Sequence, residues 1–325
     1  MGSRVASVTP SRAAMVGVSR WQLNGPGYVR VRHGVYVPAT TPLDELDTRV
    51  AVIASGLPLG FVVGGWAAAR LHERRRVGRA DGLLVFDGRL PEMDVRSRVE
   101  LPVLVCTSRP GRLRPQRGVR LFRSDLAAGD VMTVDGVPVT SPLRTAFDLA
   151  RLWTTTPAVV ALDRLRSLGL VSAEPLGALV AARPGWVGTA RARRALQLSD
   201  DRVESPRESM MRLLWMRARL PRPRCNAVVR DLRGRFVGRV DLLDDGVGLV
   251  GEYDGAHHAG AEQRWSDAVR QESLEELGLV VIRTLDRDLV TVEGRHAWQE
   301  RLRRAHRRAR TWDRPRGWVV DERAS

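Results

Sequence analysis

The C-terminal third of the chain has a regular pattern of apolar and polar positions. A helical stretch is followed by three short segments of alternating or continuous apolar residues, separated by turns that contain Gly or Asp. The predicted elements are a helix over 205–220, strands over 225–231, 234–244 and 246–255, a helix over 261–278, a strand over 279–285 and a helix over 294–310. This α-β-β-β-α-β-α order predicts an α/β fold for the region.

The first 40 residues form a smaller pattern. Residues 9–23 predict two short helices with a turn near Gly17, and residues 28–37 alternate and break at His33-Gly34, as a β-hairpin would. Two helices and a hairpin are the outline of a winged helix-turn-helix. A plain α/β lead-in also fits, because the second helix would end early, at Asn24-Gly25-Pro26.

The pattern between these regions is mixed. Helices are predicted over 43–56, 64–75, 142–153, 157–169, 172–183 and 188–199, and strands over 82–89, 101–108, 118–124 and 137–140. No catalytic constellation is evident, so we interpret the region as a scaffold or a partner surface. The domains predicted are a winged-helix-like segment 1–40, a mixed middle region 41–200, an α/β domain 204–312 and a tail 313–325, in a chain of mixed α+β class.

Composition narrows the class of protein. The 325 residues are 43% hydrophobic, include two cysteines, and contain no apolar run near the ~18 residues that a membrane span needs. The first residues lack the apolar core of a signal peptide, so we expect a cytoplasmic protein without membrane contact. Two cysteines exclude a disulfide framework and a multi-cysteine zinc site.

The chain is strongly basic. Its formal charge is +16, and all 53 basic residues are arginine, because the sequence contains no lysine. Such a charge attracts polyanions, and double-stranded DNA is the partner we expect. A solvated basic surface is the alternative.

Three acids gather in the predicted hairpin that ends in LVGEYDGAHH. Asp241 lies near the end of one strand, and Glu252 and Asp254 share a face of the next because they are two residues apart. Three neighbouring carboxylates repel each other unless a cation lies among them, and hard oxygen ligands suit Mg²⁺ or Mn²⁺. Such a site suits phosphodiester hydrolysis. The alternative is an ordinary polar turn at Asp254-Gly255.

Other polar residues have two interpretations each. Glu208 completes a capping box with Ser205, or it joins the acids if the helix start lies beside Asp241. His257 and His258 could polarise a water or lie in an exposed loop. Arg283, in an apolar strand, needs a partner such as a site carboxylate or a phosphate.

One further charged residue has an ordinary interpretation. Arg270 lies three residues after Asp267 in a predicted helix, and this spacing predicts a helix ion pair.

These residues resemble a known family. The segments ESPRES, LPRP, GRFVGRVDLL, GEYDGAHH, SDAVRQESLEELG and VVIRTLDRDLV are similar, in this order, to the domain-of-unknown-function family related to very-short-patch-repair endonucleases. That family belongs to the PD-(D/E)xK restriction-endonuclease-like superfamily, whose core is αβββαβ. The resemblance implies Mg²⁺-dependent DNA cleavage in DNA repair or phage defence. The metal ligands it implies are Asp241, Glu252 and Glu208, and His258 would assist the attacking water.

The sequence departs from the superfamily at one position. The lysine expected two residues after the third-strand acid is Asp254, and the chain has no lysine to replace it. The group that stabilises charge in the transition state would have to be His258, Arg283, or a second metal held by Asp254.

The N-terminal half resembles AbiEi-like antitoxins of type IV toxin–antitoxin systems. The segments that carry this resemblance are VSRWQL, RVRHGVYVP, GGWAAARLH and VTSPLRTAFDLARL. It implies a DNA-binding winged helix with Arg20, Arg30 and Arg32 near phosphates, and a cognate toxin or defence partner.

Three hypotheses follow. The first is a Mg²⁺-dependent endonuclease with an N-terminal DNA-binding module, and this is the interpretation we favour from sequence. The second is a DNA-binding, antitoxin-like regulator with a catalytically silent nuclease-like domain. In the third, the acids form a structural ion network with Arg239 and Arg283.

Overall fold

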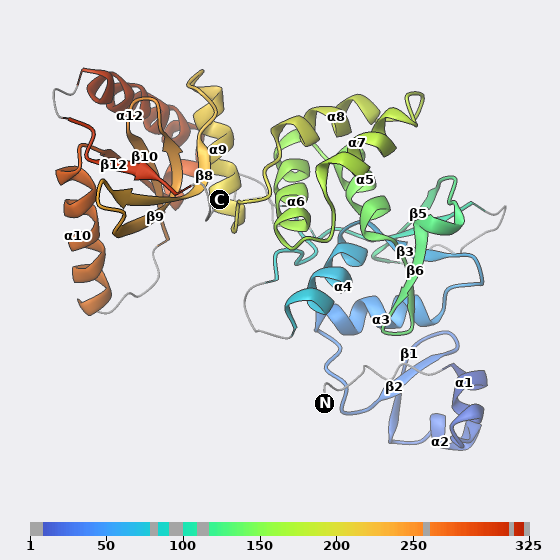
Figure 1. Cartoon of the computed structure of the whole chain (residues 1–325). Helices are drawn as coiled ribbons and strands as arrows, with labels where there is room; N and C mark the ends of the chain where they lie inside the picture. Colours follow the sequence, from blue (N-terminus) through green and yellow to red (C-terminus); the bar gives the residue numbers. More distant parts are fainter. Residues whose placement is uncertain are drawn as a thin grey trace. The chain divides into compact units, whose positions relative to one another are not determined.

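The computed structural model describes residues 9–78, 84–90, 100–108, 117–255, 261–311 and 315–321 (Figure 1). These residues form two compact units that are discontinuous in sequence. The first unit takes its residues from 1–90, 99–152 and 170–189, and the second from 153–169 and 190–325. The class is mixed α/β, as predicted.

The start of the first unit has the predicted order of two helices and a hairpin. Its elements are α1 (Pro10–Met15), α2 (Arg20–Leu23), β1 (Tyr28–Arg32) and β2 (Val35–Pro38). The side chain of Ser19 accepts a hydrogen bond from the backbone of Gln22, whose side chain accepts from Ser19 in return, and this capping box fixes the start of α2. Ala13, Leu23 and Tyr36 form a small core between the helices and the hairpin.

The rest of the first unit is built on a five-stranded sheet. Its elements are α3 (Leu46–Ser55), β3 (Val62–Gly64), α4 (Gly65–Val77), β4 (Val103–Thr107), β5 (Val119–Arg123), a short 3₁₀ turn (Ala128–Asp130), β6 (Val131–Val134), β7 (Val137–Thr140), α5 (Pro142–Leu152) and α7 (Ala173–Ala181). The strand order is β5-β4-β3-β7-β6, with β4–β5 and β3–β7 parallel.

The strand predicted over 82–89 is wrong for its described residues. Residues 84–88 join no sheet, and Arg89 makes only an isolated bridge to Glu100. The backbone N–H groups of Val85 and Phe86 donate instead to the buried carboxylate of Glu73, at 3.0 and 3.2 Å. The buried acid thus takes the donors that a strand ladder would have used.

The second unit contains the predicted α-β-β-β-α-β-α series. Its elements are α6 (Thr155–Ser167), α8 (Thr189–Leu198), α9 (Pro206–Arg217), β8 (Arg224–Asp231), β9 (Phe236–Asp244), β10 (Leu249–Asp254), α10 (Ala261–Glu276), β11 (Val280–Leu285), α11 (Asp286–Val290), α12 (Val292–Arg310) and β12 (Trp318–Val320). The sheet order is β11-β10-β9-β8-β12, and only β10–β11 is parallel among these pairs. Strand β12 lies in the segment predicted as a tail, and it pairs with β8.

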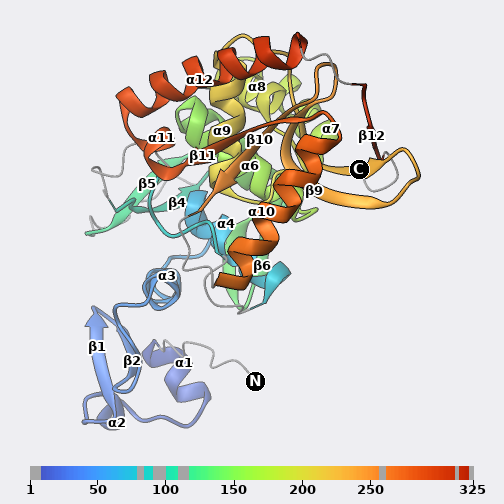
Figure 2. The same ribbon diagram turned by 90° about the vertical axis from the view of Figure 1, so that its left-hand side faces the viewer.

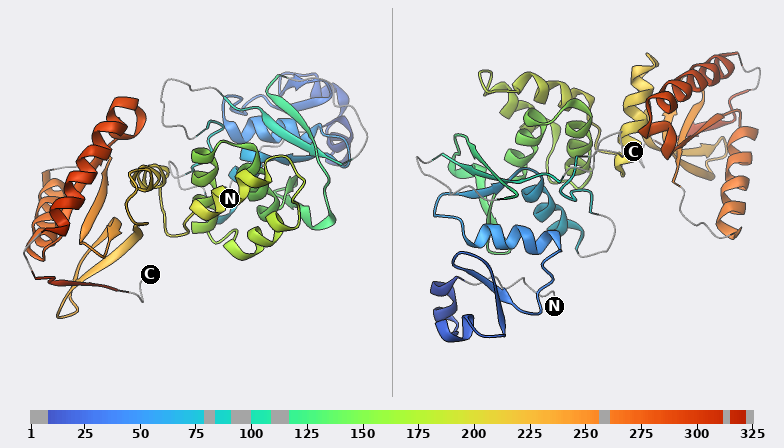
Figure 3. Two further views of the ribbon diagram at one scale, coloured as in Figure 1. Left: turned by 90° about the horizontal axis from the view of Figure 1, so that it is seen from above. Right: turned by 180° about the vertical axis from the view of Figure 1, so that it is seen from behind.

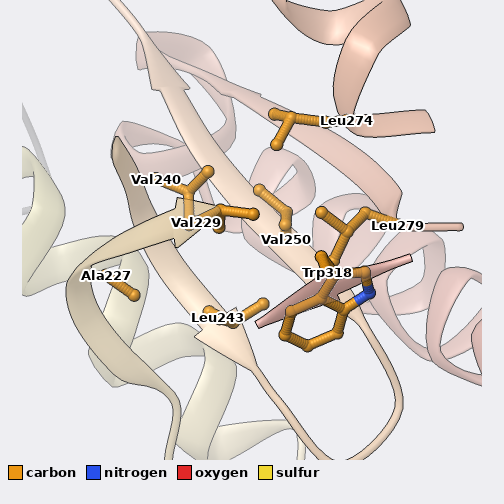
Figure 4. Close-up of a cluster of buried hydrophobic side chains, with 8 residues drawn as sticks. All are labelled: Ala227, Val229, Val240, Leu243, Val250, Leu274, Leu279 and Trp318. Carbon is orange, nitrogen blue, oxygen red and sulfur yellow. The ribbon is translucent and has the colours of Figure 1, made fainter. Parts of the chain in front are cut away.

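Helices cover both faces of this sheet (Figures 2 and 3). Leu274 of α10 belongs to the same buried cluster as Val240 and Val250, which Trp318 completes (Figure 4). On the opposite face, the ring of Trp215 in α9 lies where a Cβ on Gly251 would approach it to 3.1 Å. Val250 and Gly251 are neighbours in β10 and therefore point to opposite faces of the sheet. It follows that α10 covers one face of the sheet and α9 covers the other.

A buried charge network joins α6 to α9 within the second unit. The carboxylate of Asp163 accepts hydrogen bonds from Arg212 and Ser209, both at 2.7 Å, and from the backbone of Asp200 at 2.8 Å. Arg212 also donates to the carbonyl of Leu198. The network fixes the helix that carries Glu208.

Among the helices in the described part of the chain, none is long and apolar enough to cross a membrane.

Candidate functional site

Asp241 and Glu252 lie side by side at the end of the second unit's sheet. Strands β9 and β10 are antiparallel, with Leu242 paired to Gly251, so the next pair in this register is Asp241 with Glu252. The backbone N–H of Tyr253 donates to Oδ2 of Asp241 at 2.7 Å. The hairpin therefore has the geometry that the spacing predicted. In β9, Gly238, Val240 and Leu242 are buried, Val237 and Asp241 are half-buried, and Phe236 and Arg239 are exposed.

Arg270 holds the carboxylate of Glu252. Its two terminal nitrogens donate to the two oxygens of Glu252, at 2.9 and 3.1 Å, and Nη1 also donates to the carbonyl of Arg239 at 3.1 Å. The Glu252 side chain is 11% exposed, so this two-pronged pair is largely shielded from water. Sequence reasoning assigned Arg270 to a local helix pair with Asp267, whose side chain lies outside the described residues. A contact between α10 and β10 gives no periodic signal in the sequence.

The environment of Asp241 disfavours its charge. Its pKa is raised to about 6, mainly by burial and in smaller part by the neighbouring carboxylates of Glu208 and Glu252. The hydrogen bond from Tyr253 and the positive charge of Arg270 act in the opposite direction. The sum is a carboxyl group that takes up a proton more readily than an ordinary aspartate.

Glu208 reaches the same cluster from the start of α9. Ser205 caps the helix by accepting from the Glu208 backbone at 3.2 Å, as predicted. The Glu208 carboxylate does not turn back to Ser205; it accepts from the backbone of Glu204 at 3.0 Å and from Nδ2 of Asn226 at 2.8 Å. Asn226 has a φ of +48° in β8, a left-handed conformation that asparagine tolerates, and sequence reasoning missed it.

The remaining predicted site residues form ion pairs of their own or lie outside the described residues. Asp254 pairs with Arg283 at 3.2 Å, so the expected carboxylate partner of Arg283 is present, although both side chains are about 40% exposed. Arg239 pairs with Glu204 at 2.7 Å. His257 and His258 lie outside the described residues.

The carboxylates do not fit a Mg²⁺ ion as they are arranged. Across the described residues, no group of three His, Cys, Asp or Glu side chains is placed to hold a metal ion. Both oxygens of Glu252 accept from Arg270, and Glu208 accepts from Asn226. A metal ion at this place would compete with these hydrogen bonds for the same carboxylate oxygens.

The three arginines predicted to bind DNA differ in surroundings. Arg20 in α2 and Arg30 in β1 are exposed, and Arg30 lies 2.9 Å from Nδ1 of His33 at the hairpin tip. Arg32 is half-buried and donates to the carbonyls of Val52 and Ile53 at the end of α3, at 3.4 and 3.3 Å. Its geometry is that of a helix C-cap.

An exposed aromatic residue lies beside Arg20. Trp21 is 83% exposed, and sequence reasoning did not single it out. A single exposed apolar side chain is common on protein surfaces, so Trp21 by itself assigns no binding surface.

Comparison with known proteins gives two matches. Residues 81–199 match the family described as the AbiEi antitoxin C-terminal domain. Over 279 residues the chain is 31% identical to the Mycobacterium tuberculosis proteins named "Uncharacterized protein MT2308" (strain CDC 1551 / Oshkosh) and "Uncharacterized protein Rv2248" (strain ATCC 25618 / H37Rv), covering 85% of this chain and 92% of each relative. No solved structure matches. The antitoxin-like part of the predicted resemblance is thus confirmed for 81–199, and the endonuclease-like part stays a prediction.

Proposed function

Because the chain belongs to the family of the Mycobacterium tuberculosis proteins MT2308 and Rv2248, which match it over most of its length, we propose a function for that shared architecture. The protein is a DNA-binding regulator of the antitoxin type, and its nuclease-like C-terminal domain is catalytically silent. The observation that carries this proposal is the match of residues 81–199 to an antitoxin domain, which follows a basic module of two helices and a hairpin.

The N-terminal module supplies the DNA contacts. Arg20 and Arg30 are exposed, and the net charge of +16 favours approach to a polyanion. The hairpin formed by β1 and β2 would act as the wing, with His33 and Gly34 at its tip. Arg32 connects the module to α3, because it donates hydrogen bonds to the carbonyls at the end of that helix.

The antitoxin-like segment supplies the partner surface. An antitoxin acts on a toxin, so the second partner in this proposal is a cognate toxin protein. The predicted role of residues 41–200 as a scaffold or partner surface agrees with this assignment.

DNA binding is tested by fluorescence anisotropy of the full chain with a 30-bp labelled duplex, across a series of salt concentrations. The double variant Arg20→Ala/Arg30→Ala should weaken binding at least ~10-fold and reduce the salt slope by about 2, since each phosphate contact contributes about 1. The variant Arg193→Ala/Arg194→Ala removes the same charge from exposed positions of α8 and is the matched control. Equal losses in both variants would refute the assigned module.

A metal-dependent endonuclease is the second candidate. It is favoured by the position of Asp241, whose pKa is raised first by burial and then by the neighbouring carboxylates of Glu208 and Glu252. In this candidate Mg²⁺ or Mn²⁺ would be bound by these acids, with Asp254 and His258 completing the predicted site. Nicking of plasmid DNA in Mg²⁺ or Mn²⁺, absent in EDTA and in Asp241→Ala, would establish it over the silent domain.

A further inference from the structure

We propose that the guanidinium of Arg270 takes the place of a cation in the carboxylate cluster of the second unit, formed by Glu208, Asp241 and Glu252. In this position it prevents the cluster from binding a divalent metal ion. The two nitrogens of its guanidinium fork bind the two oxygens of Glu252. A fork of this kind occupies the lone pair of each carboxylate oxygen that faces it and fixes the carboxylate in the plane of the guanidinium. The positive charge in this site is therefore that of the Arg270 side chain, in the place where a metal ion was predicted.

The position of Arg270 is specified by more than its charge. Its aliphatic stem lies over Gly238, where an added Cβ would come within 3.4 Å of Arg270 Cδ. Its Nη1 is also held by the carbonyl of Arg239. Three features therefore fix the position of this side chain: the space above Gly238, the carbonyl of Arg239 and the carboxylate of Glu252.

Charge balance explains why a metal would be excluded. Glu208, Asp241 and Glu252 contribute three negative charges when ionised, and Arg270 neutralises one of them from within the cluster. A divalent ion that bound Glu252 would have to displace the guanidinium or lie beside it, and like charges at contact distance repel strongly when shielded from water. Displacement would also break three hydrogen bonds.

The same geometry predicts what removal of Arg270 would do. Without the guanidinium, Glu252 loses the two hydrogen bonds from Arg270, and the cluster loses the positive charge that Arg270 places beside its carboxylates. Repulsion among them then favours uptake of a divalent ion. This inference rests on the silent-domain part of the proposed function and does not depend on DNA binding.

The test compares Mn²⁺ binding by the full-length wild type and Arg270→Gln, measured by the electron paramagnetic resonance signal of free Mn²⁺ and by thermal unfolding with and without the ion. The wild type should leave the free signal unchanged at sub-millimolar Mn²⁺. Arg270→Gln should bind one Mn²⁺ at least 10-fold more tightly and gain thermal stability from it. Adding Glu252→Gln to Arg270→Gln is the matched control and should abolish the gain.

The outcomes are distinct. Equal Mn²⁺ affinity in wild type and Arg270→Gln would overturn the proposal, and so would a folded Arg270→Gln that gains no Mn²⁺ binding. If Arg270→Gln does not fold, Arg270→Met, which keeps an apolar stem over Gly238, is measured under the same criteria. DNA anisotropy on the same samples separates the two proposals. Absence of DNA binding by the wild type would refute the proposed function, whereas Mn²⁺ uptake by the wild type would refute only the closed site.

Discussion

The buried pair of Asp163 and Arg212 gives the sharpest stability prediction. The two side chains are 1% and 0% exposed, and Asp163 joins α6 to α9 through Ser209 as well. Replacing Asp163 by Ala removes the acceptor of three hydrogen bonds and leaves the Arg212 guanidinium buried without its counter-ion. Because loss of one member of a buried ion pair costs about 3–5 kcal/mol, we expect Asp163→Ala to lose about 4 kcal/mol of unfolding free energy.

The size of the loss follows from desolvation. Burial raises the pKa of Asp163, because the surroundings disfavour its negative charge. Arg212 and the hydrogen bonds to the carboxylate act in the opposite direction and stabilise that charge. A buried cation without an acceptor has no such compensation. In a unit of this size each 1 kcal/mol corresponds to about 2–4 °C, so the unfolding transition should fall by about 10 °C.

Urea unfolding of the full chain, followed by tryptophan fluorescence, measures the effect because Trp215 and Trp298 lie buried in the same unit. The double variant Asp163→Leu/Arg212→Met replaces both charges by apolar groups and should lose less free energy than Asp163→Ala, since no ion is then buried alone. A loss below about 1 kcal/mol in Asp163→Ala would refute the reasoning. A double variant that loses the sum of two single losses would refute it equally.

Three further predictions follow from single contacts. Burial above all raises the pKa of Asp241 to about 6, so its contribution to stability is full below about pH 4 and is lost as the pH rises through about 6; urea unfolding in EDTA should show a loss on the order of 3 kcal/mol that shrinks in Asp241→Asn, and an unchanged slope would contradict this cause. Arg32→Met should lower the unfolding free energy by about 1 kcal/mol in thermal denaturation, because two carbonyls of α3 lose their donor, while the salt slope of DNA binding stays the same; a reduced slope would show a phosphate contact. Gly251→Ala should cost about 1–3 kcal/mol in chemical denaturation because its Cβ meets the ring of Trp215 at 3.1 Å, whereas Gly129→Ala, with open space, should cost under about 0.5 kcal/mol; equal costs would contradict the packing argument.

The fold could be predicted where side-chain periodicity and turn residues agree. The series from α9 to β11, and α12 after it, followed from apolar spacing and from turns such as Asp244–Gly246, whereas the short helix α11 was not predicted. The sequence did not predict β12, because three residues after a basic helix carry too little pattern to distinguish a strand from a tail. Nor did it predict the loss of a strand near Val85, because the cause is a carboxylate on α4.

The candidate site could be predicted as far as one hairpin determines it. The spacing of Asp241 and Glu252 predicted their pairing, since antiparallel register follows from a short turn. Arg270 and Asn226 were missed because they approach from α10 and β8, and such contacts depend on how elements pack. The contacts that decide the character of the acids are therefore tertiary contacts with other elements. They change the interpretation from a metal site towards an ion-paired cluster.

The pairing of β12 with β8 delays completion of the sheet during synthesis. Trp318 lies opposite Asp231, so the ribosome has made all the elements from β9 to α12 before the outer edge of β8 finds its partner. Until then β8 exposes unpaired backbone groups, which readily join strands of other chains. Chains released early, before residue 315, would keep that open edge and lack the indole that completes the cluster in Figure 4. Such incomplete products are the species we expect to aggregate or to be degraded.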